Sequence, residues 1–243
     1  MTQKQESTLT AAASEIRRMI ATRGSREHAK GVQWFFKEEI KSRGWYTAEL
    51  RRTARRYRRE VQKERGSEFL VRLANELSSG EVLDEKNFAV FLLEGMTTEF
   101  GHAEFKLFES WLDRISSWAD HDALVHYLVA PMIAANPARI KYVFRWTKSP
   151  DRWHRRAACV ALIQGTRRHM FFGEIASLSN RLLNDPDDMV QKGVGWLLRE
   201  TAKADPKRTI PHLMRIRHSS PRLVLRTACE TLNTATRFQI LSS

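Results

Sequence analysis

Cysteine and long apolar runs are what this sequence most clearly lacks. Its 243 residues include two cysteines, Cys159 and Cys229, which are too few for a disulfide-bonded scaffold. No stretch approaches the roughly 20 apolar residues that a membrane-spanning helix needs. The N-terminal segment also lacks the long apolar run of a signal peptide. We therefore expect a soluble, reduced, cytoplasmic protein with no membrane partner.

Motifs of fixed spacing that bind cofactors or perform catalysis are absent as well. The sequence contains no Gly-rich phosphate loop and no nucleophile elbow, and its 8 histidines and two cysteines show no zinc-ligand spacing. Alternating strand patterns bounded by turn residues are almost absent too. These absences predict a protein of the all-α class that holds no metal and no cofactor.

Positive charge is what the sequence has in excess. It contains 41 Lys and Arg against 28 Asp and Glu, a net charge of +13. Residues 1–66 hold 17 basic and 8 acidic side chains, residues 67–135 hold 4 and 12, and residues 136–243 hold 20 and 8. Such an excess opposes compaction through self-repulsion, so it indicates a polyanionic partner. Arg outnumbers Lys, which favours phosphate, and the arginine run over residues 51–59 predicts a basic helix face that contacts it.

Apolar residues recur with the 3.6-residue period of helices, between short stops rich in Pro, Gly, Ser or Asp. The predicted helices cover residues 8–22, 26–43, 47–65, 67–77, 86–97, 101–115, 120–134, 136–147, 151–166, 171–183, 187–203, 207–217 and 220–235.

A repeat is visible in the second half of the chain. The stops Ser149-Pro150-Asp151, Asp185-Pro186-Asp187 and Ser220-Pro221-Arg222 lie 36 and 35 residues apart. Each stop places Pro near the first helical position, and a cation followed by small residues comes soon after. This spacing predicts a HEAT-like α-solenoid of stacked antiparallel helical hairpins, with a basic concave face and a single domain over residues 1–243.

The predicted helix 187–203 has two distinct faces. The apolar stripe that we expect to face the core comprises Val190, Val194, Leu197, Leu198 and Thr201. Lys192, Trp196 and Arg199 lie on the opposite side, at i, i+4 and i+7. A lone Trp more often packs against a neighbouring hairpin, which is the alternative interpretation. Two cations on its own face favour a contact surface for a partner.

A second polar segment, residues 116–124, begins another predicted helix. Asp120 is expected to cap that helix, because Asp at an N-terminus accepts backbone N–H groups and complements the helix dipole. Asp122 lies in the first turn, four residues after Trp118, so the two side chains could share a face or flank one cleft. From spacing alone, capping without any further function is the alternative.

Arg156 lies in a predicted helix that is apolar almost all round. A charge in such a helix must be paired or must line a groove. One interpretation is that Arg156 forms an ion pair between repeats. The other is a phosphate contact, which the neighbouring Arg152 and Arg155 favour, and we weigh the two interpretations equally.

These residues resemble the AlkD-like DNA alkylation-repair glycosylases, which are HEAT-repeat proteins. Residues 34–41 (WFFKEEIK) and 47–51 (TAELR) look like the family's opening helices. Residues 117–122 (SWADHD) are similar to its catalytic Trp-Asp-x-x-Asp stretch, although Ala119 stands where the family often has Asp. Residues 192–200 (KGVGWLLRE) look like a later signature, and the resemblance covers most of the chain.

The resemblance implies a role for each candidate residue. Asp122 would be the catalytic carboxylate, and Trp118 and Trp196 would form the aromatic cradle at the lesion. Arg156 would hold the DNA backbone, and the cations Lys192 and Arg199 beside Trp196 are expected to bind DNA as well.

The implied activity is a DNA glycosylase that excises cationic N3- or N7-alkylated purines and leaves an abasic site. We expect it to act on double-stranded DNA as a monomer, associated with the nucleoid in a prokaryote. The alternative is a non-catalytic HEAT-repeat protein that binds branched or distorted DNA. A protein-interaction scaffold with acidic partners is a third possibility.

Overall fold

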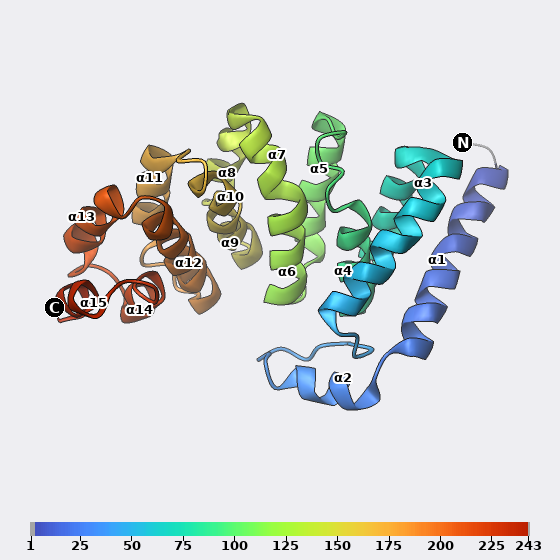
Figure 1. Ribbon diagram of the computed structural model, residues 1–243, viewed down its shortest axis with the longest axis horizontal. Coiled ribbons are helices and arrows are strands. Elements are labelled where there is room, and N and C mark those ends of the chain that lie inside the picture. Colours follow the sequence, from blue (N-terminus) through green and yellow to red (C-terminus); the bar gives the residue numbers. More distant parts are fainter. Residues whose placement is uncertain (1–2, 243) are drawn as a thin grey trace. The chain divides into compact units, whose positions relative to one another are not determined.

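The computed structural model describes residues 3–242, and all regular structure in that range is helical, with no strand (Figure 1). The all-α prediction is therefore confirmed. Within the described residues, no helix is both long enough and apolar enough to cross a membrane.

Contacts within the chain divide it into two compact units, one ending at Leu128 and the other beginning at Val129. The two units are described separately below. A single domain over residues 1–243 stays a prediction.

The N-terminal unit is built around one long helix. Its helices are α1 (Gln3–Arg23), α2 (Arg26–Gln33), α3 (Thr47–Ser78), α4 (Leu83–Leu93), α5 (His102–Ser110), the 3₁₀ segment η1 (Trp111–Arg114) and α6 (Trp118–Leu124). Helix α3 packs along α4 and α1, and Figure 1 shows α1 and α3 side by side. Gly66, at φ 74°, interrupts α3 at the break between the helices predicted over 47–65 and 67–77.

The predicted helix 26–43 is too long. Helix α2 ends at Gln33, and residues 34–46 form an irregular loop. The Gln33 amide explains the early end, because it donates to the Glu38 carbonyl at 2.8 Å and accepts from the Ile40 N–H at 2.9 Å. Side-chain bonds of this kind offer the backbone an alternative to continuing the helix.

The C-terminal unit stacks helical hairpins. Its elements are α7 (Ala130–Ala135), η3 (Pro137–Arg139), α8 (Ile140–Trp146), α9 (Arg152–Val160), α10 (Ile163–Thr166), α11 (Phe172–Leu182), α12 (Asp188–Ala204), α13 (Pro206–Ile216), α14 (Arg222–Ala228) and α15 (Thr234–Leu241). The π-helical segment η2 (Val125–Val129) joins α6 to α7. Helix α12 packs against both α9 and α14, so the three repeat copies are consecutive layers.

The repeat stops begin these three helices, but their prolines lie earlier than predicted. Asp151 and Asp187 are the N-caps of α9 and α12, and each accepts two backbone N–H bonds. The first two prolines therefore precede the cap, and Pro221 is itself the cap residue of α14. The reason is that the carboxylate that follows each of the first two prolines takes the capping position.

Candidate nucleic-acid interface

Helix α6 begins with a capping box rather than with an Asp120 cap. Ser117 is the N-cap, and its hydroxyl accepts the Ala119 N–H at 3.3 Å. Asp120 stands at the third helical position, where its carboxylate accepts the Ser117 N–H at 2.8 Å. The prediction of Asp120 as the cap is wrong by three residues, because the Ser117 hydroxyl is correctly placed for the role. Ala119 contributes only its backbone N–H to the cap, so the cap does not need an acid there.

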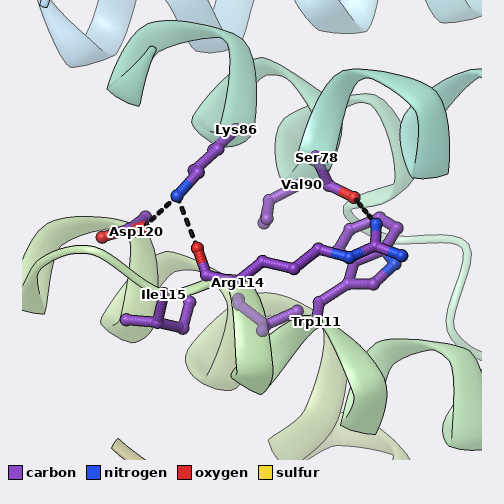
Figure 2. Close-up of a pocket in the computed structure, with 8 residues that line it drawn as sticks. Ser78, Lys86, Val90, Trp111, Arg114, Ile115 and Asp120 are labelled. Atoms are coloured by element: carbon purple, nitrogen blue, oxygen red, sulfur yellow. Dashed lines mark hydrogen bonds and ion pairs between the residues drawn. The ribbon is translucent and has the colours of Figure 1, made fainter. Parts of the chain in front are cut away.

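Asp120 also pairs with a buried lysine. Lys86 and Asp120 are 7% and 2% exposed, and Nζ of Lys86 lies 3.3 Å from the Asp120 carboxylate. The same ammonium donates to the Arg114 carbonyl at 2.5 Å (Figure 2). It also donates to the Ser116 hydroxyl at 3.2 Å. A cavity of about 20 Å³ beside the pair has room for about one water molecule. Lys86 thus ties the start of α6 to α4.

Asp122 is held by its own neighbour. Nδ1 of the fully buried His121 lies 2.6 Å from Oδ1 of Asp122. This is a hydrogen-bond distance, and an ionised carboxylate only accepts, so the ionised form of Asp122 pairs with an N–H at Nδ1 of His121. The Asp122 side chain is 20% exposed, so solvent reaches part of it. The carboxylate is both orientated and accessible.

Trp118 leads α6 and contacts the irregular loop. Its ring stacks on Phe36 with centroids 4.9 Å apart and an interplanar angle of 16°. The indole Nε1 donates to the Phe35 carbonyl at 3.4 Å. Trp118 and Asp122 are four residues apart on α6, which places them on the same side of the helix.

In the C-terminal unit, α12 has the two faces that its sequence predicts. The five residues of the predicted apolar stripe are all buried. Lys192, Trp196 and Arg199 are partly exposed. Lys192 lies 3.6 Å from Asp188, and Arg199 is paired with Glu200 at 3.2 Å and with Glu230. The Asp188 and Glu230 side chains are more exposed than that of Glu200, which is 12% exposed, so the pairs with Asp188 and Glu230 lie at the surface and contribute little to stability.

Two glycines of α12 bring neighbouring helices close. A Cβ on Gly195 would lie 2.6 Å from Cβ of Thr227 on α14. A Cβ on Gly193 would lie 3.3 Å from Cγ of Arg156 on α9. The small residues beside Trp196 therefore serve helix packing within the unit.

Arg156 is 5% exposed and lies between two repeat layers. Its guanidinium donates to the Met189 carbonyl at 2.6 Å, which ties α9 to the start of α12. Its neighbours make ion pairs between repeats: Nε of Arg155 lies 2.7 Å from the Asp185 carboxylate, and the Arg152 guanidinium lies 3.4 Å from that of Asp187. A DNA contact by Arg156 stays a prediction.

The arginine run of α3 divides into two sets. The inner arginines, which turn toward the C-terminal end of α4, are Arg51, Arg55 and Arg58. Arg51 and Arg55 bind the Glu94 carboxylate, and Arg58 donates to the Glu94 carbonyl. The outer arginines, which are exposed to solvent, are Arg52, Arg56 and Arg59. The outer arginines present a cationic face of the kind that the sequence predicts, and Arg55, whose side chain is 47% exposed, adds to it although it also binds Glu94.

The six predicted site residues thus fall into two groups. Trp118 and Asp122 lie on α6 of the N-terminal unit, and the other four lie on α9 and α12 of the C-terminal unit. Sequence reasoning assigned no role to three residues that hold the side chains of α6. His121 contacts Asp122, Phe36 stacks on Trp118, and Lys86 pairs with Asp120. The position of His121 beside Asp122 was the one available signal.

Comparison with known proteins identifies the family. The family model described as DNA alkylation repair enzyme matches residues 16–232. A predicted DNA alkylation repair enzyme from Enterococcus faecalis has a similar structure, with a TM-score of 0.78, 15% identity, and coverage of 88% of this chain and 99% of that one. AlkD2 from Streptococcus mutans is similar at a TM-score of 0.64 and 17% identity, with coverage of 93% and 100%. No curated protein sequence matches. Because the family model matches most of its length, the chain belongs to the DNA alkylation repair enzyme family.

Proposed function

We propose that this protein is a DNA glycosylase that excises cationic N3- or N7-alkylated purines from double-stranded DNA. The observation that carries the proposal is the Asp122 carboxylate, which is partly exposed and held 2.6 Å from Nδ1 of His121. It stands four residues after an aromatic ring, on a helix whose start is fixed from α4.

The chemistry of the lesion matches this small set of groups. An N-alkylated purine is already cationic, so the bonding pair of the N-glycosidic bond leaves with the base, which departs neutral without a general acid. The sugar becomes an oxocarbenium-like cation, and water then adds to its anomeric carbon and loses a proton. Asp122 supplies a negative charge facing that cation and orients the water.

The aromatic and cationic groups fit the same reaction. An indole face attracts the positive charge of the lesion, which contributes about 0.5–2 kcal/mol for each ring. Trp118 and Trp196 are the proposed rings, and Arg156, Lys192 and Arg199 are the proposed DNA contacts. His121 acts as a positioning residue, because its hydrogen bond fixes the direction of the Asp122 carboxylate.

The direct test is release of base from DNA that contains 7-methylguanine, with detection of the free base and the abasic site. Asp122→Asn keeps the size of the side chain and removes its charge. We expect single-turnover excision to fall 100-fold or more, a barrier increase of about 2.7 kcal/mol. DNA binding should hold or tighten slightly, because one repulsive charge has gone.

The matched control is Asp113→Asn, which changes an exposed carboxylate of η1 in the same unit. Asp120 does not serve as a control, because it pairs with the buried Lys86. Equal excision rates for the wild type and Asp122→Asn, with both proteins folded, would contradict the mechanism. DNA binding without any base release would favour the non-catalytic alternative.

A further inference from the structure

The loop of residues 34–46 presents two large apolar side chains to solvent. Trp34 is 90% exposed and Phe35 is 75% exposed, the highest values among the large hydrophobic side chains of the described residues. Trp45, in the same loop, is buried and donates its Nε1–H to the Ile20 carbonyl at 3.0 Å. The loop therefore buries one indole and exposes another.

The loop is braced at both ends, so the exposure of Trp34 belongs to an ordered segment. At its start, the Gln33 side chain bonds the backbone of Glu38 and Ile40. At its end, the buried Asp84 carboxylate accepts the Arg43 N–H at 2.6 Å and the Trp45 N–H at 3.1 Å. Few intramolecular contacts would be lost if Trp34 bound a partner.

The middle of the loop is fixed to the candidate site. Phe36 lies two residues after Trp34, and its ring stacks on Trp118. The Phe35 carbonyl accepts from the Trp118 indole. The exposed side chains of Trp34 and Phe35 therefore lie next to the contacts that the loop makes with Trp118. We expect DNA bound at Trp118 to contact them.

We propose that Trp34 stacks on a nucleobase that has left the helical stack of bound duplex DNA. Every base has an apolar π face, and aromatic side chains stack on bases once they are unstacked. Such a base is easiest to obtain at a bulge, a mismatch or a damaged site, where unstacking costs least. Exposed Lys30, Lys37 and Arg43 around the loop suit the phosphates on either side.

This inference rests on the proposed binding of DNA, and it goes beyond the proposed reaction by naming the form of DNA that the protein prefers. Trp34 would make the protein favour duplexes with an unstacked base over fully paired duplexes. The cations would contribute equally to both, because phosphate contacts do not depend on base stacking.

The test compares an intact duplex with one that contains 2-aminopurine in a single-nucleotide bulge, by binding and by quenching of the 2-aminopurine fluorescence. We expect the wild type to bind the bulged duplex about tenfold more tightly and to quench its fluorescence. Trp34→Ala should lose both the preference and the quenching, and Trp34→Phe should retain most of each. Affinity for the intact duplex should change little.

Phe238→Ala is the matched control, because Phe238 is an exposed aromatic residue (71%) of the C-terminal unit. It should leave both measurements unchanged. The inference would be overturned if Trp34→Ala kept the preference for the bulged duplex and the quenching. An equal loss of both in Phe238→Ala would also overturn it. Neither result would bear on base excision, which is measured separately. Absence of DNA binding by the wild type would defeat both proposals. Melting temperatures of the variants should match the wild type, because Trp34 has little packing to lose.

Discussion

Helices α6 and α12 both carry a tryptophan beside charged candidates, but they hold those charges differently. On α6, Asp120 is buried against Lys86, and Asp122 is fixed by a buried histidine. On α12, Lys192 and Arg199 pair with carboxylates at the surface. Buried charges must be paired with good geometry, whereas exposed pairs contribute little to stability. The difference agrees with the roles that we propose, a fixed charge at Asp122 and solvent-accessible cations at Lys192 and Arg199.

The largest expected effect is a change in the free energy of unfolding when a cation is removed from each helix's ion pair. Lys86→Met leaves the buried Asp120 carboxylate without its cation, so the free energy of unfolding should fall by about 3 kcal/mol. Lys192→Met, which removes a cation from an exposed pair, should change it by less than about 0.5 kcal/mol. Urea unfolding measures both. Equal losses would show that the two helices do not differ in the way they hold charge.

Trp196 offers a second test, because it is the aromatic candidate of α12. Trp196→Ala should lower 7-methylguanine excision about tenfold through the lost cation–π contact. The fold should lose less than it does in Trp153→Ala, which truncates a buried indole of the same unit and should cost about 3–5 kcal/mol. If Trp196→Ala lowers the melting temperature as much as Trp153→Ala and leaves excision intact, Trp196 is a packing residue.

A smaller effect separates the two sets of arginines on α3. Replacement of the outer arginines by Gln should lower DNA affinity and reduce the salt dependence of binding by about one unit of slope per lost phosphate contact, with the melting temperature unchanged. Replacement of the inner arginines should lower the melting temperature, because Glu94 loses its partners. Titration of binding between 50 and 200 mM salt, with thermal melting, checks both. If replacement of the inner and of the outer arginines changed the melting temperature and the salt dependence of DNA binding equally, the two sets would not differ in role.

The smallest expected effect is a pH dependence of the C-terminal unit. Burial lowers the pKa of His212 below its usual 6.5, and Arg215 adds repulsion. The unfolded chain therefore binds this proton more readily, so the stabilisation is complete above about pH 6.5 and is lost as the pH falls below it. His212→Gln, which has no group that titrates in this range, should reduce this loss. An identical pH dependence in the variant, measured by denaturant unfolding, would contradict the assignment.

The sequence predicted those features that depend on short-range periodicity. The apolar stripe of α12 and the cations opposite it follow from the helical repeat alone. The stops at Asp151 and Asp187 begin α9 and α12 because each carboxylate accepts backbone N–H groups of the residues that follow it. The end of α2 could not be predicted in this way. It depends on the Gln33 side chain, which competes with the helix for backbone groups.

What the sequence determined by itself is therefore the all-helical class, the repeat and the two faces of α12, since each is fixed by spacing along one helix. Only the tertiary structure decided which charges are available for function. It placed Lys86, 34 residues before Asp120, against that carboxylate, and it turned three of the six arginines over residues 51–59 toward the C-terminal end of α4. It also stacked Phe36 on Trp118 and left Trp34 in solvent. Contacts between residues far apart in the chain leave no periodic signal, because they depend on how packed helices meet.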